Sequence, residues 1–140
     1  MSHMTQIELE IKDLQALKNA CAKLGFQFVK GQTTYKWYGR FMGDYPLPEG
    51  IRKEDLGKCD HAIVVPGAGY EVGVVKKEDK YILLWDFYKA GGLANALGQN
   101  GKLLKIMYST EKVKLAAKRK HYKIIETRTK TGEVVLTLRK

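Results

Sequence analysis

Three short apolar segments joined by tight turns constrain the fold of this chain more than any other feature. They occupy residues 61–65, 70–75 and 80–85. The connections, residues 66–69 and 77–79, are too short for a helix to cross over a sheet. Because strands joined in this way run antiparallel, the sequence predicts a three-stranded meander.

A helix is predicted over residues 13–24, directly after a segment at 5–11 whose apolar and polar residues alternate as in a half-buried strand. Asp13 offers a side-chain acceptor for the first turn, and Gly25 stands where a left-handed cap would end the helix. The apolar face of this helix carries Leu14, Leu17, Cys21 and Leu24. We therefore expect Cys21 to be a small core residue and not a nucleophile.

The stretch between this helix and the meander gives mixed signals. Two strands are predicted on either side of residues 30–32, one around 26–28 and one over 33–41. Glycines and prolines then predict a long loop over 42–60, with a short helical turn at 52–57. Loops of this length inside a compact domain are often functional.

After the meander, a long helical segment is predicted over residues 93–120, interrupted near 98–101, and then a hairpin with strands at 122–129 and 133–138. This order of elements predicts a single α+β domain over residues 1–140. It has a mostly antiparallel sheet, two main helices on one face and a C-terminal β-hairpin. The ferredoxin-like plait is the nearest named arrangement.

Composition excludes several classes of protein. Hydrophobic residues make up 44% of the chain, which is typical of a globular protein, and no apolar run approaches the roughly 18 residues of a membrane span. The two cysteines, Cys21 and Cys59, are too few for a disulfide framework. No basic segment followed by an apolar stretch opens the chain, so we expect no secretory signal and a cytoplasmic location.

Charge is distributed unevenly along the chain. Residues 101–140 hold 12 basic and 3 acidic side chains, against 6 and 5 in residues 1–50 and 7 and 7 in residues 51–100. The last forty residues therefore carry +9 of the formal net charge of +10. Such asymmetry is typical of a surface that binds a polyanion, although a basic surface can also serve solubility alone.

The basic residues of the second helix share one face when the helix is projected at 100° per residue. Within an arc of about 100° lie five of them: Lys102, Lys105, Lys112, Arg119 and Lys120. The opposite side carries the apolar residues that we expect to face the sheet: Leu103, Ile106, Met107, Val113 and Ala117. Three more cations extend the positive field into the hairpin: Lys123, Arg128 and Lys130.

This face predicts a non-enzymatic protein that binds a phosphate-bearing partner, namely RNA, DNA or a nucleotide. No zinc-finger spacing and no aromatic-rich RNA-binding strand is present, and the apolar side of the helix is needed for the core, so we expect no membrane partner. An acidic protein is the alternative partner, which would make the chain an adaptor or a viral antagonist of a host factor. An exposed strand edge would also allow a homo-oligomer.

A glycine-containing loop precedes the second helix and is a candidate phosphate loop. Lys89, Gly91 and Gly92 stand where a backbone can approach an anion closely. The loop matches neither the P-loop nor the dinucleotide-binding pattern. A strand-to-helix turn that needs positive φ explains the same glycines.

Reactive side chains cluster at one place, Cys59-Asp60-His61. Cys59 and His61 would share a strand face and are weak candidates for metal ligands, because four ligands are not in sight. A small enzyme using Cys59, His61 and Asp86 is a third hypothesis, but we predict no catalytic residue and no cofactor. Five aromatic residues could stack on a base or fill the core: Trp37, Tyr38, Trp85, Phe87 and Tyr88.

Short motifs along nearly the whole chain point to one family. They are the opening Met1-Ser2-His3-Met4, residues 12–17, residues 70–75 followed by 84–87, and Leu103-Leu104-Lys105 before the basic helix and closing hairpin. Together they resemble a small family, a domain of unknown function, encoded in plastid, cyanobacterial, other bacterial and large-phage genomes. Residues 55–61 look phage-like. The resemblance implies that Ser2-His3-Met4 is native and implies no activity, cofactor or catalytic residue.

Overall fold

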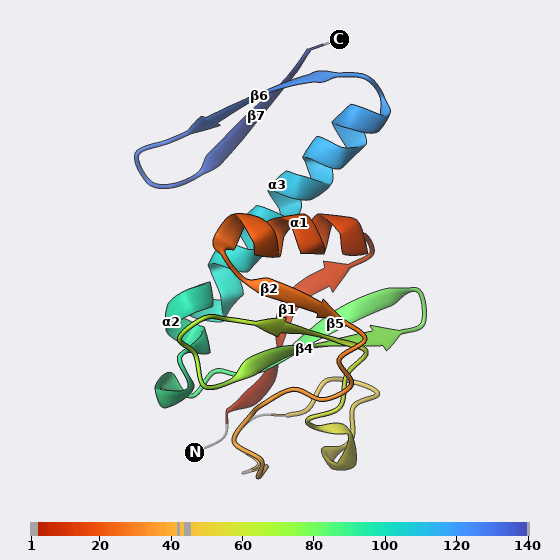
Figure 1. Ribbon diagram of the computed structural model, residues 1–140, viewed down its shortest axis with the longest axis vertical. Helices are drawn as coiled ribbons and strands as arrows, with labels where there is room; N and C mark the ends of the chain where they lie inside the picture. Colours follow the sequence, from red (N-terminus) through yellow and green to blue (C-terminus); the bar gives the residue numbers. More distant parts are fainter. Residues whose placement is uncertain (1–2, 42, 44–45, 140) are drawn as a thin grey trace.

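A five-stranded antiparallel sheet forms the centre of the molecule, as the computed structural model in Figure 1 shows. The structure describes residues 3–41, 43 and 46–139, so Met42, Asp44 and Tyr45 of the predicted loop and the start of the opening Met1–Met4 motif lie outside it. The strand order is β1-β5-β4-β3-β2. The strands are β1 (Met4–Ile11), β2 (Gln27–Lys30), β3 (His61–Val64), β4 (Glu71–Lys77) and β5 (Lys80–Asp86).

The predicted meander and first helix are confirmed. Strand β4 pairs antiparallel with both β3 and β5. Helix α1 (Leu14–Leu24) begins where the Asp13 carboxylate accepts a hydrogen bond from the Ala16 amide at 3.1 Å, and it ends at Gly25, whose φ is 79°. Helix α1 carries the chain from one edge of the sheet, β1, to the other, β2. Four strands then follow before the next α-helix, so the element order departs from the β-α-β-β-α-β order of a plait.

The main helices cover one face of the sheet, as predicted. The second helical segment consists of α2 (Leu93–Leu97) and α3 (Lys102–Arg119), and a short 3-10 turn, Gln99–Gly101, makes the predicted interruption. Sheet residues that point toward these helices are almost fully buried, among them Ile7, Ile63, Val72 and Leu83. The fold is therefore α+β with a predominantly antiparallel sheet.

The other face of the sheet is covered by the connection between β2 and β3. Tyr35, Ile51 and Leu56 from this connection form a second buried cluster with four sheet residues: Met4, Ala62, Ile82 and Leu84. The predicted helical turn is present as a 3-10 helix, Lys53–Asp55. This segment explains how the sheet can be buried on both sides although α-helices cover only one.

The predicted strand at 33–41 is wrong. Its one bridge to another described residue is an isolated pairing between Thr34 and Lys58. Tyr35 crosses the sheet directly over Gly73, where a Cβ atom would lie 2.4 Å from the Tyr35 ring. The segment alternates like a strand because its residues alternately face the sheet and water, and its backbone follows the sheet face and does not extend an edge.

Helix α3 is rotated relative to the prediction. Met107 and Ala117 are buried as expected, but Leu103 and Val113 are 46% and 42% exposed. The side facing the protein instead carries Leu104, Tyr108 and Glu111. The cause is contact with the start of α1, because the buried Tyr108 hydroxyl accepts hydrogen bonds from the amides of Lys12 and Asp13, both at 3.2 Å.

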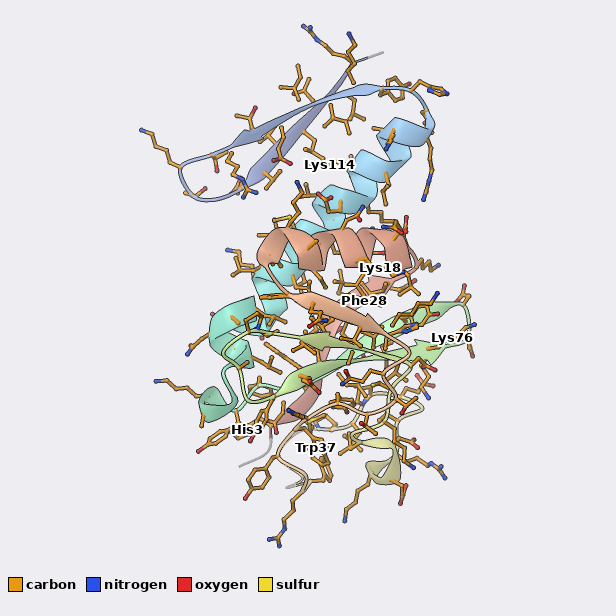
Figure 2. The ribbon with its side chains drawn as sticks, in the orientation of Figure 1. His3, Lys18, Phe28, Trp37, Lys76 and Lys114 are labelled. Carbon is orange, nitrogen blue, oxygen red and sulfur yellow. The ribbon has the colours of Figure 1, made fainter. Side chains whose placement is uncertain are left out.

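The C-terminal hairpin is confirmed and stands apart from the main sheet. Helix α3 runs past α1, and β6 (Lys123–Arg128) and β7 (Val134–Arg139) fold back beside its second half (Figure 1). Lys114 lies between α3 and the hairpin (Figure 2), where it pairs with Glu126 of β6. None of the helices within the described ranges is long and apolar enough to cross a membrane.

Candidate nucleic-acid interface

The basic residues predicted for the second helix lie along α3 and at its C-cap, Lys120, and we call them the basic ridge: Lys102, Lys105, Lys112, Arg119 and Lys120. Lys102, Lys112 and Lys120 are exposed and Lys105 is half-buried. At 1.5 Å per residue, the ridge extends over about 27 Å. Among the residues that the structure describes, no carboxylate forms an ion pair with any of the four lysines.

Arg119 is the member of the ridge that has an acidic partner. Its guanidinium lies 3.6 Å from the carboxylate of Asp13, the residue that caps α1. The Arg119 side chain is nevertheless 65% exposed, so this contact is weakened by solvent. Lys123 continues the positive surface as the exposed first residue of β6. The six predicted polyanion-binding residues thus remain on the surface.

Two acidic residues, Glu111 and Glu126, are held by a lysine on the side of α3 away from the ridge. Lys114, nine residues after Lys105, lies 3.2 Å from the buried Glu111 and also pairs with Glu126. The hydrogen bond from Lys114 lowers the pKa of Glu126, and the same bond raises the pKa of Lys114. Two of the three carboxylates in the last forty residues are therefore engaged with one lysine, which leaves the ridge positive.

The glycines of the candidate phosphate loop have structural partners. The amides of Gly91 and Gly92 donate to the carbonyls of Tyr88 and Lys89 at 2.9 and 3.2 Å. A Cβ atom on Gly91 would lie 2.0 Å from the Tyr70 ring, and Gly92 has a φ of 85°. These contacts explain both glycines by packing and turn geometry, and neither amide is left to bind an anion.

Hydrogen bonds to the backbone fix the side chains of Cys59, just before β3, and of His61, its first residue. The Cys59 thiol donates to the Gln32 carbonyl at 3.1 Å, and burial raises the pKa of this thiol to about 11. The Nδ1 atom of His61 accepts from the Gly31 amide at 3.0 Å. Within the described part of the chain, no group of three His, Cys, Asp or Glu side chains could hold a metal ion.

Asp86 is a buried structural carboxylate. One of its oxygens accepts from the amides of His3 and Tyr88, at 3.0 and 3.1 Å, and the other accepts from the Tyr38 amide at 3.1 Å. The side chain is fully buried. Asp86 therefore joins the N-terminal segment, the end of β5 and the segment over the second sheet face, and it has no access to a substrate in solution.

A cavity of about 560 Å³ opens beside the ridge, and sequence reasoning missed it. Its walls come from the free edge of β1, the end of β5 and the turn between α2 and α3. Trp85 and Phe87, two of the predicted stacking residues, line it, and so does Lys105 of the ridge. No local sequence motif predicts this site, because the segments of β1 and β5 that line it lie about 80 residues apart in sequence.

No family model, curated protein or solved structure matches the chain closely enough to assign it to a family. The family resemblance of the sequence therefore stays a prediction.

Proposed function

We propose that this protein is a non-enzymatic nucleic-acid-binding protein that contacts phosphates through the basic ridge. One observation carries the proposal: four lysines follow about 27 Å of helix without a carboxylate partner among the described residues. A lysine row with no internal neutralisation releases counterions from a phosphate backbone when it binds.

The length of the ridge favours a polymer over a free nucleotide. Adjacent phosphates of one DNA strand are about 3.4 Å apart along the helix axis, so the ridge can follow several of them. If the five ridge residues each contact one phosphate, the logarithm of the association constant should fall with the logarithm of salt concentration with a slope of about −4.

Charge reversal on the ridge tests this function. The variant Lys102→Glu, Lys112→Glu, Lys120→Glu changes three exposed lysines that lie outside the cavity. The matched control is Lys36→Glu, Lys53→Glu, Lys58→Glu, which changes the net charge equally with three exposed lysines of the segment over the other sheet face. Binding to a labelled oligonucleotide is measured by fluorescence anisotropy across a salt series.

The ridge variant should bind weakly, and the salt slope should become shallower by about 2.4, the share of three of the five phosphate contacts. The control should lose less affinity, through net charge alone. Equal losses in the two variants would show that only total charge matters, and undiminished binding by the ridge variant would refute the proposal.

A second candidate function, docking on an acidic protein, is favoured by a separate observation. The hairpin exposes three large apolar side chains beside its cations: Ile125, Val135 and Leu138. Capture of a partner that survives nuclease treatment and is lost on Ile125→Asp would favour this adaptor role over nucleic-acid binding.

A further inference from the structure

We propose that the outer edge of β7 pairs antiparallel with the β7 edge of a second copy of this chain, so that the dimer has a shared sheet in the order β6-β7-β7-β6. The hairpin has two strands, so each has one edge without a partner strand among the described residues. Such an edge is a template for another strand unless charges, prolines or bulges protect it. The hairpin stands apart from the main sheet, which leaves the edge uncovered by the body (Figure 1).

The pairing inside the hairpin shows which backbone groups of β7 point outward. At the turn, the Thr129 amide donates to the Glu133 carbonyl at 2.9 Å. Residues of an antiparallel ladder alternate between pairs that exchange hydrogen bonds and pairs that do not. Counting in twos from Glu133, the amides and carbonyls of Val135, Thr137 and Arg139 therefore point to β6. The backbone groups of the alternate residues point to the free edge: Val134, Leu136 and Leu138.

The sequence of β7 lacks the features that protect an edge. Residues 134–139 contain no proline, glycine or lysine, and their one charged residue, Arg139, stands at the end. Three of the six residues are β-branched, which favours a strand. Val135 and Leu138 are 47% and 44% exposed. An edge of this kind would promote aggregation if it stayed open, so we infer that a defined partner covers it.

A pairing centred on Leu136 brings the outward backbone groups of the two copies together. Leu136 then lies opposite Leu136 of the other copy, and on either side Val134 lies opposite Leu138. Each of these pairs exchanges both of its backbone hydrogen bonds, because all three residues point outward. The side chains of the three pairs are apolar, so none of the contacts sets like charges against each other.

Charge selects this register over its neighbours. Centred on Leu136, the pairing sets Glu133, just before β7, directly opposite Arg139 of the other copy, and this contact occurs twice in the dimer. Opposite charges directly across an antiparallel pair stabilise it. Both side chains are exposed, and neither forms an ion pair with another described residue. Moving the centre by one residue would break both contacts.

A groove between α3 and the hairpin leaves room for the end of the second strand. Glu133 and Val134 both line this groove, whose volume is about 410 Å³. Successive residues of a strand point to opposite faces, so a space lined by both lies at the edge, where β7 begins. In the proposed register, Arg139 of the other copy meets Glu133 at this groove. The opposite wall comes from α3: Lys105, Ile106, Ser109 and Thr110.

The β6 edge is unsuited to the same pairing. By the same alternation, the backbone groups of Ile124, Glu126 and Arg128 point outward there. A two-fold pairing centred on Glu126 would set this carboxylate against its own copy, and like charges directly opposite each other destabilise a strand pair. Glu126 is also held by Lys114. We therefore expect the dimer to form through β7 and not through β6.

The dimer would place both basic ridges on one side. The two-fold axis of an antiparallel strand pair is perpendicular to the sheet, so both α3 helices pack on the same face of the shared sheet. Lys114 faces the hairpin, and Lys105, nine residues earlier, points the opposite way at about 100° per residue. The outer face of the hairpin, which carries Ile125, stays open. The inference goes beyond the proposed function and does not rest on it.

A charge exchange at the two ends of β7 tests the inference and its register. Glu133→Arg sets positive charges opposite each other in the dimer, and Arg139→Glu sets negative charges opposite each other. The double variant Glu133→Arg, Arg139→Glu restores opposite charges. Sedimentation velocity at rising protein concentration measures the dissociation constant of the dimer, and circular dichroism confirms that each variant is folded.

We expect the unchanged protein to dimerise reversibly, each single variant to weaken the dimer at least about tenfold, and the double variant to regain the original affinity. An equimolar mixture of the two single variants should also dimerise, because each then meets opposite charges on the other. An effect of net charge alone would have opposite signs in the two single variants. A protein that stays monomeric up to about 1 mM, or single variants that dimerise like the unchanged protein, would overturn the inference.

Hydrogen exchange shows which edge is paired. As protein concentration rises, the amides of Val134, Leu136 and Leu138 should exchange more slowly, because they become hydrogen-bonded in the dimer. The outward amides of β6 are the internal control and should exchange at a constant rate. Slower exchange at β6 instead, or a dimer in which neither edge is protected, would refute pairing through β7. These measurements use no nucleic acid, so their failure is distinguishable from failure of the proposed function.

Discussion

The body of the molecule and its C-terminal arm are stabilised in different ways. The body comprises the five-stranded sheet with helices on one face and the described part of the β2–β3 connection on the other, and sheet residues such as Leu83 and Ile63 are fully buried. The arm comprises the second half of α3 and the β6–β7 hairpin, in which Ile125 and Val135 are 46% and 47% exposed. The body is held by apolar burial, whereas the arm depends on a few contacts with one helix.

Ion pairs and local packing take the place of a core in the arm. An isolated two-stranded hairpin is at best marginally stable in water. Here Lys114 of α3 pairs with both Glu111 and Glu126, which fastens β6 to the helix. The cavity that Lys105 lines lies in the body, and the far end of the basic ridge lies in the arm.

We expect the largest difference between the two regions when one leucine in each is replaced by alanine and the free energies of unfolding are compared. Leu83→Ala removes a fully buried side chain from the central sheet and should lower the free energy of unfolding by about 2–5 kcal/mol. Leu136→Ala in β7 removes a half-buried side chain and should cost about 1 kcal/mol or less. Urea denaturation followed by tryptophan fluorescence measures the loss in the body, where Trp37 and Trp85 lie, and the amide NMR signals of the hairpin measure the loss in the arm. Similar losses would mean that the hairpin belongs to the same cooperative unit as the body.

The second-largest effect on stability is expected for Asp86→Asn, at the buried carboxylate that joins three backbone segments of the body. The Asp86 carboxylate accepts three backbone hydrogen bonds through both oxygens, and an Asn side chain keeps only one oxygen. We expect a loss of about 1.5–3 kcal/mol, measured by the same denaturation. Asp60→Asn is the control, since Asp60 is exposed and accepts from a single amide, that of Lys76. An equal effect of the two substitutions would contradict the role of Asp86 as the junction.

Local signals in the sequence predicted the elements of both regions. Asp13 and Gly25 marked the ends of α1, and the short turns of the meander and hairpin predicted antiparallel pairing. These features depend on residues that are neighbours in sequence, so the chain alone reveals them. The positions of the ridge lysines followed in the same way, because they depend only on the helical repeat.

Features that depend on distant contacts could not be predicted. The alternating residues of 33–41 suggested a strand, and only the structure shows that Tyr35 lies over Gly73 on the sheet face. The inward side of α3 was misassigned because Tyr108 meets the start of α1, a contact between residues about 95 apart. The cavity has the same property, since β1, β5 and the α2–α3 turn each contribute only a part of its wall.

Acidification should loosen the arm before the body. The lowered pKa of Glu126 means that its pairing with Lys114 stabilises the hairpin fully above the ordinary value of 4.5 and is lost as pH falls through the lower folded value. Glu126→Gln should remove this dependence and cost about 0.5–1 kcal/mol near neutral pH. NMR spectra of hairpin and sheet amides from pH about 6 to about 3 would follow it. Simultaneous change of both sets of signals would contradict an independently anchored arm.

The smallest effect is expected on the free face of the hairpin. Ile125 points away from α3 and is paired across the hairpin with Thr137. If this face is in water, Ile125→Thr should change the free energy of unfolding by no more than about 0.5 kcal/mol. The same substitution at the fully buried Ile63 should be severely destabilising, because it removes apolar volume and buries a hydroxyl. Sedimentation and denaturation at several protein concentrations distinguish the alternatives. A loss above about 1 kcal/mol that grows with protein concentration would mean that a second copy covers this face, and this face would then be part of an interface and not a free surface.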